Sequence, residues 1–349
     1  MTPPTSHTAS SFYLHPAQRA GIAQLRRSWL WRLELPTWLL IATVYSGWFG
    51  IVMNWHNLGA WLGTPLLILF TTWYMSLQHE LIHGHPTRWR RVNQLFGLLP
   101  LAVWYPFGLY RDSHLQHHRN EHLTVPGEDP EGYYFTPQQW QRFPPLMKRI
   151  IRLRNTFIGR LTLGPVLDIL GTLADALRAV WQRKVRVMLM WGTHIILLAL
   201  LLHWMVNFGL SPLYFVLAIG YPSLSLTKVR SFFEHRAEES PQARSTINEA
   251  GWAWRLLFLN LNYHLVHHDL PGVPWYGLRR VYLAEREQYQ LRSQGFLVKG
   301  YSEWIRAYAF TPVQVEAHPL SPVHELPVVT SHPEPSVQRC DPLPSLERA

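Results

Sequence analysis

Four apolar stretches, each about as long as a bilayer is thick, contain no lysine or arginine. They cover residues 33–53, 58–77, 187–206 and 210–227. Because about 20 apolar residues are needed to cross the hydrocarbon core as a helix, these stretches predict four transmembrane helices. Only a few residues separate the members of each pair, so we expect two helical hairpins in an all-α integral membrane protein.

The basic residues predict the orientation of these hairpins. All 32 lysine and arginine residues lie before the first stretch, between the two pairs or after the last stretch. By the positive-inside rule, both termini and the long middle segment are expected to be cytoplasmic, in a bacterial inner membrane or an ER-type membrane. The same distribution explains the net charge of +10. A nucleic-acid partner is not expected, because it would need these charges grouped on one face of a soluble domain.

The chain divides into three parts. Residues 1–32 are predicted to be a cytoplasmic segment, residues 33–310 the membrane domain, and the proline-rich residues 311–349 a disordered tail. Residues 95–109 are apolar but contain two prolines and two glycines, which indicates a re-entrant or interfacial segment. Residues 146–186 mix arginines with apolar residues, and this pattern fits helices lying on an anionic leaflet or solvated cytoplasmic helices equally well.

Cysteine and histidine contents restrict the chemistry. The single cysteine is Cys340, so the residues of this chain cannot form a disulfide, a cysteine-ligated zinc site or an iron–sulfur cluster among themselves. Histidine is abundant, with 19 residues against 22 aspartates and glutamates. Any metal chemistry must therefore depend on imidazole or carboxylate ligands.

Three histidine clusters follow the spacing of one helix face. They are His79 and His83; His114, His117 and His118; and His264, His267 and His268. Residues three and four apart on a helix lie on the same side, so each cluster directs its imidazoles one way. The predicted topology places all three on the cytoplasmic side. Imidazole binds iron, copper, zinc or nickel, and eight imidazoles exceed the needs of one ion, so two metals are expected. His235 follows the last stretch and is a ninth candidate.

Two other kinds of metal site are possible interpretations, but each would use fewer of these histidines. Residues 79–83 also match the HExxH motif of zinc proteases, with Glu80 as the general base, but that interpretation leaves the other clusters unused. A soluble di-iron carboxylate bundle needs two Glu-x-x-His pairs and two further glutamates, and only Glu80 with His83 qualifies.

Several neighbouring side chains could support the clusters without binding metal. A set of carboxylates is expected either to accept hydrogen bonds from ligand imidazoles or to be exposed: Glu80, Asp129, Glu234 and Asp269. His85 is expected in a supporting or surface position, and His122 to face solvent. The aromatic residues Trp104, Tyr105, Phe107 and Tyr110 either line a tunnel or fill a core.

The three clusters, placed across two hairpins, resemble the membrane fatty acid desaturase family, whose relatives include alkane hydroxylases and carotenoid ketolases and hydroxylases. The resemblance covers residues 58–283 and includes the stretches 230–236 and 262–275. In that family the clusters hold a di-iron centre that activates dioxygen at the end of a substrate tunnel. The resemblance implies nine iron ligands, namely His79, His83, His114, His117, His118, His235, His264, His267 and His268.

The resemblance also implies a dioxygen-dependent oxidoreductase with two iron ions, most simply a desaturase that forms a carbon–carbon double bond in a lipid acyl chain. A hydroxylase or ketolase of a hydrocarbon, carotenoid or specialised metabolite fits the same clusters. An inactive membrane binding protein is an alternative from another class. No haem, flavin or iron–sulfur motif accompanies the clusters, so electrons are expected from a separate ferredoxin or small cytochrome. Arg111, Arg119 and Arg279 are candidate docking residues for such an acidic carrier.

Overall fold

The structure, a computed structural model, describes residues 14–119, 122–313 and 316–319. The first thirteen residues of the predicted N-terminal segment, and the predicted tail from residue 320 onward, lie outside the described residues. In the described part of the tail, the backbone N–H of His318 donates to the carbonyl oxygen of Phe135 over 2.8 Å.

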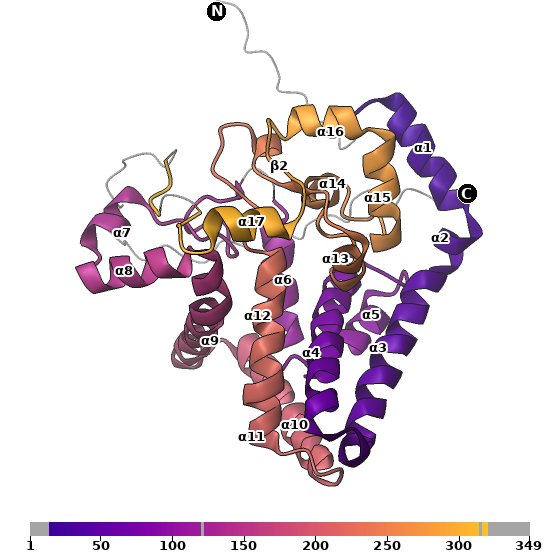
Figure 1. Cartoon of the computed structure of the whole chain (residues 1–349), viewed down its shortest axis with the longest axis vertical. Helices are drawn as coiled ribbons and strands as arrows, with labels where there is room; N and C mark the ends of the chain where they lie inside the picture. Colours follow the sequence, from indigo (N-terminus) through magenta and orange to yellow (C-terminus); the bar gives the residue numbers. More distant parts are fainter. Residues whose placement is uncertain (1–13, 120–121, 314–315, 320–349) are drawn as a thin grey trace, which may run out of the picture.

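The described chain is mostly helical (Figure 1). Its first half contains α1 (Pro16–Arg27), α2 (Trp29–Leu33), α3 (Leu35–Met53), α4 (Trp55–Ile82), α5 (Arg90–Gly97), α6 (Phe107–His117), α7 (Pro137–Arg142) and α8 (Pro145–Arg154). The second half contains α9 (Phe157–Trp181), α10 (Val185–Val206), α11 (Pro212–Tyr214), the π-helix η2 (Phe215–Gly220), α12 (Tyr221–Arg230), the 3-10 turn η3 (Pro241–Ala243), α13 (Trp252–Leu257), α14 (His264–Asp269), α15 (Trp275–Ala284), α16 (Arg286–Arg292) and α17 (Tyr301–Tyr308).

The only strands among the described residues are β1 (Ile247–Asn248) and β2 (Leu297–Val298), which pair in parallel. This pair is a small addition to the predicted all-α fold. It ties the segment before α13 to the segment before α17.

Four described helices are long and apolar enough to cross a membrane: α3, α4, α9 and α10. Three of them coincide with the predicted stretches 33–53, 58–77 and 187–206. Helices α3 and α4 pack along each other, and Trp48 and Val44 of α3 are fully buried in the core that they share with η2. In Figure 1 the long helices run away from the end of the molecule where α13 to α17 lie.

The predicted fourth transmembrane stretch, residues 210–227, is helical in the structure but is not a single regular α-helix. It forms three helical pieces in succession, α11, η2 and α12, rather than one long α-helix. Pro222 has no backbone N–H and interrupts the α-helical hydrogen-bond pattern, which explains the π-helical turn before it.

Helix α9 was not among the predicted transmembrane stretches. Its residues 157–181 fall in the region predicted to form helices on an anionic leaflet or solvated cytoplasmic helices. The helix is 25 residues long and meets the length and hydropathy of a membrane span. Two of its charged residues are withdrawn from solvent, since Arg160 is buried and Asp168 pairs with Lys228 of α12, whereas Asp175 and Arg178 are exposed. The opposite face carries an exposed apolar stripe of Val166, Leu170, Leu173 and Leu177, a helical spacing suited to lipid contact.

Residues 95–109, predicted to be re-entrant or interfacial, contain the end of α5, an irregular connection and the start of α6. His194 of α10 holds this connection, since its Nε2 lies 2.7 Å from the carbonyl oxygen of Val103. The connection therefore fixes where α6 begins.

The N-terminal helix α1 packs on the C-terminal helices. Ile22 is buried in the same apolar cluster as Val266 of α14 and Val281 of α15. Gln18 donates to the hydroxyl of Tyr289 on α16 over 2.8 Å. Segments from the two ends of the chain thus support α14, which carries the third histidine cluster.

Candidate metal centre

Four chain segments bring the nine predicted ligands together. His79 and His83 lie at the end of α4, the second cluster at the end of α6, His235 just after α12, and the third cluster on α14. Helix α14 is oriented by its apolar residues: Leu265 and Val266 are buried in the adjacent core, which turns the three histidines to the opposite side. His235 is positioned by an antiparallel bridge to Ser245.

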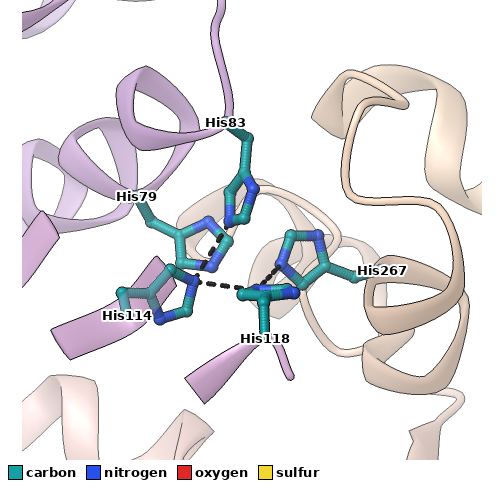
Figure 2. Close-up of side chains that lie close together, drawn as sticks. All are labelled: His79, His83, His114, His118 and His267. Atoms are coloured by element: carbon teal, nitrogen blue, oxygen red, sulfur yellow. Dashed lines mark hydrogen bonds between the residues drawn. The ribbon is translucent and has the colours of Figure 1, made fainter. Parts of the chain in front are cut away.

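The nine imidazoles divide into two sets. The first contains His79, His83, His114, His118 and His267, and the second contains His117, His235, His264 and His268. Within each set one nitrogen from every ring lies within 4.8 Å of the others. Figure 2 shows the five rings of the first set turned toward a common space, with His267 reaching it from α14.

Helix geometry explains this division. At about 100° per residue, positions i and i+4 lie roughly 40° apart around a helix, whereas i+3 and i+4 lie about 100° apart. Accordingly His114 and His118 join the first set while His117 joins the second. On α14 the assignment is reversed: His264 and His268 belong to the second set and His267 to the first.

The nitrogen spacings fit metal coordination. Between neighbouring rings the Nε2 atoms lie 2.9–3.2 Å apart in both sets. Metal–imidazole bonds of about 2.1 Å meeting at right angles would place the nitrogens about 3.0 Å apart. The two sets adjoin, since the rings of His118 and His268 stack with centroids 4.3 Å apart. This arrangement suits two ions side by side.

His79 gives a second indication that the site can hold a metal. Its side chain is 1% exposed, and neither ring nitrogen has a hydrogen-bond partner. Leaving buried polar atoms unsatisfied is costly, and a bound metal would use one of these nitrogens. Burial, reinforced by nearby imidazoles, also holds the pKa of His264, His267 and His268 well below its ordinary value. These rings are therefore neutral, the form that binds metal.

Acidic and hydroxyl side chains hold the outer nitrogens of several rings. Asp129 Oδ1 lies 2.8 Å from His117 Nδ1, Glu131 Oε1 lies 3.2 Å from His114 Nδ1, and Ser245 Oγ lies 3.2 Å from His235 Nδ1. Glu234 Oε1 lies 3.4 Å from His264 Nδ1, but these two atoms do not form a hydrogen bond. The three hydrogen bonds to His117, His114 and His235 fix the tautomer of each ring and would direct its other nitrogen toward a metal.

Asp129 remains charged in this environment. Burial raises the pKa of Asp129, but the hydrogen bond to His117, the charges of His117 and His235 and the backbone N–H of Thr124 together lower it more, so the net pKa lies below its ordinary value. Burial likewise raises the pKa of Glu131, and the contacts with His114 and His117 reverse that shift. Two ionised carboxylates at the outer side of the rings would offset the charge of bound cations.

The comparison with known families agrees with this geometry. Residues 55–298 match the family described as fatty acid desaturase. The chain belongs to the fatty acid desaturase family. None of the curated proteins compared with the chain matches it. Membership implies an oxidoreductase with desaturase- or hydroxylase-type chemistry, and the histidine sets can hold the metal that such chemistry requires.

In this desaturase-family protein, Glu80 does not occupy the position of a protease base. Its Oε1 accepts a hydrogen bond from the backbone N–H of Trp275 over 2.9 Å and lies 3.9 Å from His85 Nε2. The flanking His79 and His83 share their set with three further imidazoles. The HExxH motif therefore contributes two imidazoles to a larger set.

The remaining candidate residues lie outside the two sets. His85 is buried and its Nδ1 lies 2.7 Å from Glu34 Oε1, so it supports the end of α4 rather than a metal. His122 is half exposed and contacts Glu128. Asp269 binds Arg292. Of the four predicted supporting carboxylates, Asp129 and Glu234 contact ligands, whereas Glu80 and Asp269 do not.

Two supporting residues, Glu131 and Ser245, were missed by the sequence analysis. Both lie in irregular or bridging segments, where no periodicity relates a side chain to a distant histidine. The only available signal was that Glu131 follows two residues after Asp129.

A cavity of about 960 Å³ adjoins both sets, near the upper end of the volumes typical of ligand pockets. His79 of the first set and His117 and His235 of the second line it. Tyr105 and Tyr110 also line the cavity, whereas Trp104 and Phe107 pack in the apolar core. Two of the four aromatic residues thus line the cavity, and the other two help to fill the core.

Proposed function

We propose that this protein is a membrane-bound, dioxygen-dependent di-iron desaturase that introduces a carbon–carbon double bond into a lipid acyl chain. The observation that carries the proposal is the pair of adjoining sets of five and four imidazoles beside a cavity large enough for an organic substrate. Nitrogen ligands of this number and type suit iron, and the match to the desaturase family favours a pair of iron ions.

The overall reaction balances with one dioxygen. A –CH₂–CH₂– unit loses two hydrogen atoms, and dioxygen with two electrons and two protons becomes two water molecules. When bound, the iron pair would supply the oxidising power that no side chain has. The protein holds the nine imidazoles in place. Asp129 and Glu131 keep a proton on Nδ1 of His117 and of His114, respectively, by accepting hydrogen bonds from these nitrogens. The half-buried Tyr110 and the buried Phe232, which line the cavity, would restrict water around the substrate.

Hydroxylation or ketone formation is the nearest alternative, because the same centre serves either outcome. Desaturation requires the second hydrogen to leave the adjacent carbon, whereas hydroxylation leaves an oxygen on the first. The difference depends on small changes in substrate position relative to the metals. Analysis of the reaction products therefore distinguishes desaturation from hydroxylation better than identification of the metal-binding residues does.

We place both termini and the metal centre on the cytoplasmic side, on the strength of the distribution of lysine and arginine. Electrons would come from a separate acidic carrier. Arg119 and Arg279 are exposed and available for docking, whereas the guanidinium of Arg111 is largely buried against Asp112. We therefore retain the first two as docking residues.

Mass spectrometry of lipids from cells expressing the protein tests the proposal. We expect products lacking two hydrogen atoms, absent from cells that express His117→Ala and present with His122→Ala, a matched histidine outside both sets. Products carrying one added oxygen would instead identify a hydroxylase. A purified, well-folded protein that binds no iron and forms neither product would support the inactive binding protein.

A further inference from the structure

A group of three positive charges lies at one part of the cavity wall. The guanidinium groups of Arg154, at the end of α8, and Arg160 of α9 lie over the ring of Tyr133, and Lys228 of α12 lines the same cavity as Tyr133. Arg154, Lys228 and Tyr133 line the cavity directly, together with Asp168, whereas Arg160 lies behind Tyr133. We call these three cations the basic cluster.

Only one of the three cations has a carboxylate partner among the described residues. Asp168 forms an ion pair with Lys228 across the space between α9 and α12. Glu316 also influences Arg154, but it is paired with Arg152 at 3.2 Å. Arg154 is therefore partly buried, and Arg160 fully buried, without an ion pair to any residue that the structure describes.

Arg160 shows that the neighbouring groups do not satisfy this charge. Its residue is 1% exposed, its guanidinium lies 3.8 Å from the centre of the Tyr133 ring, and its Nη1 has no hydrogen-bond partner. Both Arg154 and Arg160 share one acceptor, Asn155 Oδ1, at 3.1 and 3.5 Å. Burial and the nearby Arg160 lower the pKa of Arg154 to about 10. A buried excess of cations is unfavourable unless an anion joins it.

The same cavity reaches the metal centre. His79, His117 and His235 line it together with Arg154 and Lys228. The chain that carries Tyr133 also carries Glu131, which contacts His114 of the first set. One substrate molecule could therefore touch the basic cluster at one point and approach the metals at another.

We propose that the basic cluster binds the anionic group of an amphipathic substrate, a carboxylate or a phosphate, and so positions its hydrocarbon part at the metal centre. The inference rests on the function proposed above and narrows its substrate to acids or anionic lipids. Neutral hydrocarbons and neutral esters would lack the charged contact. Lys228 and Arg154 contact the anion, and Arg160 acts through Tyr133 as a positioning residue.

Binding to the purified full-length protein in a neutral detergent tests this without turnover. The ligands are hexadecanoic acid, its methyl ester and a lysophosphatidic acid of the same chain length, each displacing a fluorescent alkyl probe. We expect the acid, the lysophosphatidic acid or both to bind at least about tenfold more tightly than the ester, as one charge-assisted contact allows. Selectivity for the acid identifies a free acid as substrate, and selectivity for the lysophosphatidic acid identifies a lipid headgroup.

Arg154→Met removes a cation that has no carboxylate partner among the described residues. It should lower the affinity for the preferred anion about tenfold and leave the affinity for the ester unchanged. The double variant Lys228→Met/Asp168→Asn leaves the net charge unchanged, and it should weaken binding of the anion only through the lost contact with Lys228. The matched control Arg286→Met/Glu249→Gln neutralises an ion pair outside the cavity and should change neither affinity.

Equal binding of acid, phosphate and ester by the wild type would overturn the inference, as would an equal loss for all three ligands in the double variant. These results are separable from failure of the proposed function. If selective binding of the anion persists but no unsaturated product forms, the basic cluster stands and the reaction is wrong. If the ester is bound and desaturated as well as the acid, the reaction stands and the basic cluster is not a substrate subsite.

Discussion

At the scale of single residues, Asp129 shows how a carboxylate outside the ligand set controls a ligand. It accepts from His117 Nδ1 and from the backbone N–H groups of Thr124 and Glu131. Asp129→Asn should lower metal affinity by about 10- to 100-fold, because the amide no longer fixes the tautomer of His117. Titration of the metal-free protein with ferrous iron against a competing chelator measures this. Glu128→Gln, an exposed neighbour, serves as the control, and unchanged affinity in Asp129→Asn would refute this role.

The carboxylate of Glu249 gives a pH-dependent contribution to stability. Hydrogen bonds from Arg286 and Tyr282 lower the pKa of Glu249 in the folded protein. A lowered pKa stabilises the fold above the unfolded pKa of roughly 4.5, and the effect is lost as pH falls through the folded value. Glu249→Gln should therefore lower the melting temperature more at pH 7 than in acid, where the carboxylate of the wild type becomes protonated. An equal difference at pH 7 and in acid would contradict this linkage.

At the scale of secondary structure, adjacent histidines on one helix should affect different metal ions. His117 belongs to the second set and His118 to the first. Each single alanine substitution should therefore remove mainly one of two bound ions, and the double substitution both. Iron analysis with Mössbauer spectroscopy would show different remaining signals for the two single variants. Identical spectra would mean that the helix does not divide its ligands between two ions.

The junction between α8 and α9 depends on a small residue. A Cβ added at Gly159 would lie 1.8 Å from the carbonyl oxygen of Leu153. Gly159→Ala should lower the free energy of unfolding by about 1–3 kcal/mol, because backbone must move to relieve the overlap. Gly171→Ala in the same helix meets nothing within 4 Å and should not destabilise the protein. Thermal unfolding in detergent compares them, and equal melting temperatures would contradict the expected overlap.

At the scale of the whole molecule, the net charge of +10 favours association with an acidic electron carrier. If a carrier docks at Arg119 and Arg279, charge reversal at either should raise the KM for the carrier several-fold. Added salt should weaken wild-type turnover in the same way. A small uncharged reductant provides the control, because it should support all variants equally. Insensitivity to both salt and charge reversal would exclude electrostatic docking at these residues.

Local patterns in the sequence predicted much of the fold and of the ligand set. Apolar runs without basic residues located α3, α4 and α10, because the hydropathy of such a run is a local property. Helical spacing identified the three histidine clusters, and His235 followed from its place after an apolar run. The same reasoning did not single out α9 as a candidate span, since charges that are buried or paired in the fold look solvent-exposed when only the sequence is read.

The sequence by itself therefore determined which side chains could bind metal and which segments suit a membrane. Only the tertiary structure decided how the histidines divide into two sets, that Glu131 and Ser245 support the rings, and that Arg154 and Lys228 line the same cavity as three of the histidines. The physical reason is distance along the chain. Periodicity fixes the direction of neighbouring side chains, whereas His118 and His267 meet only because packing brings α6 and α14 together.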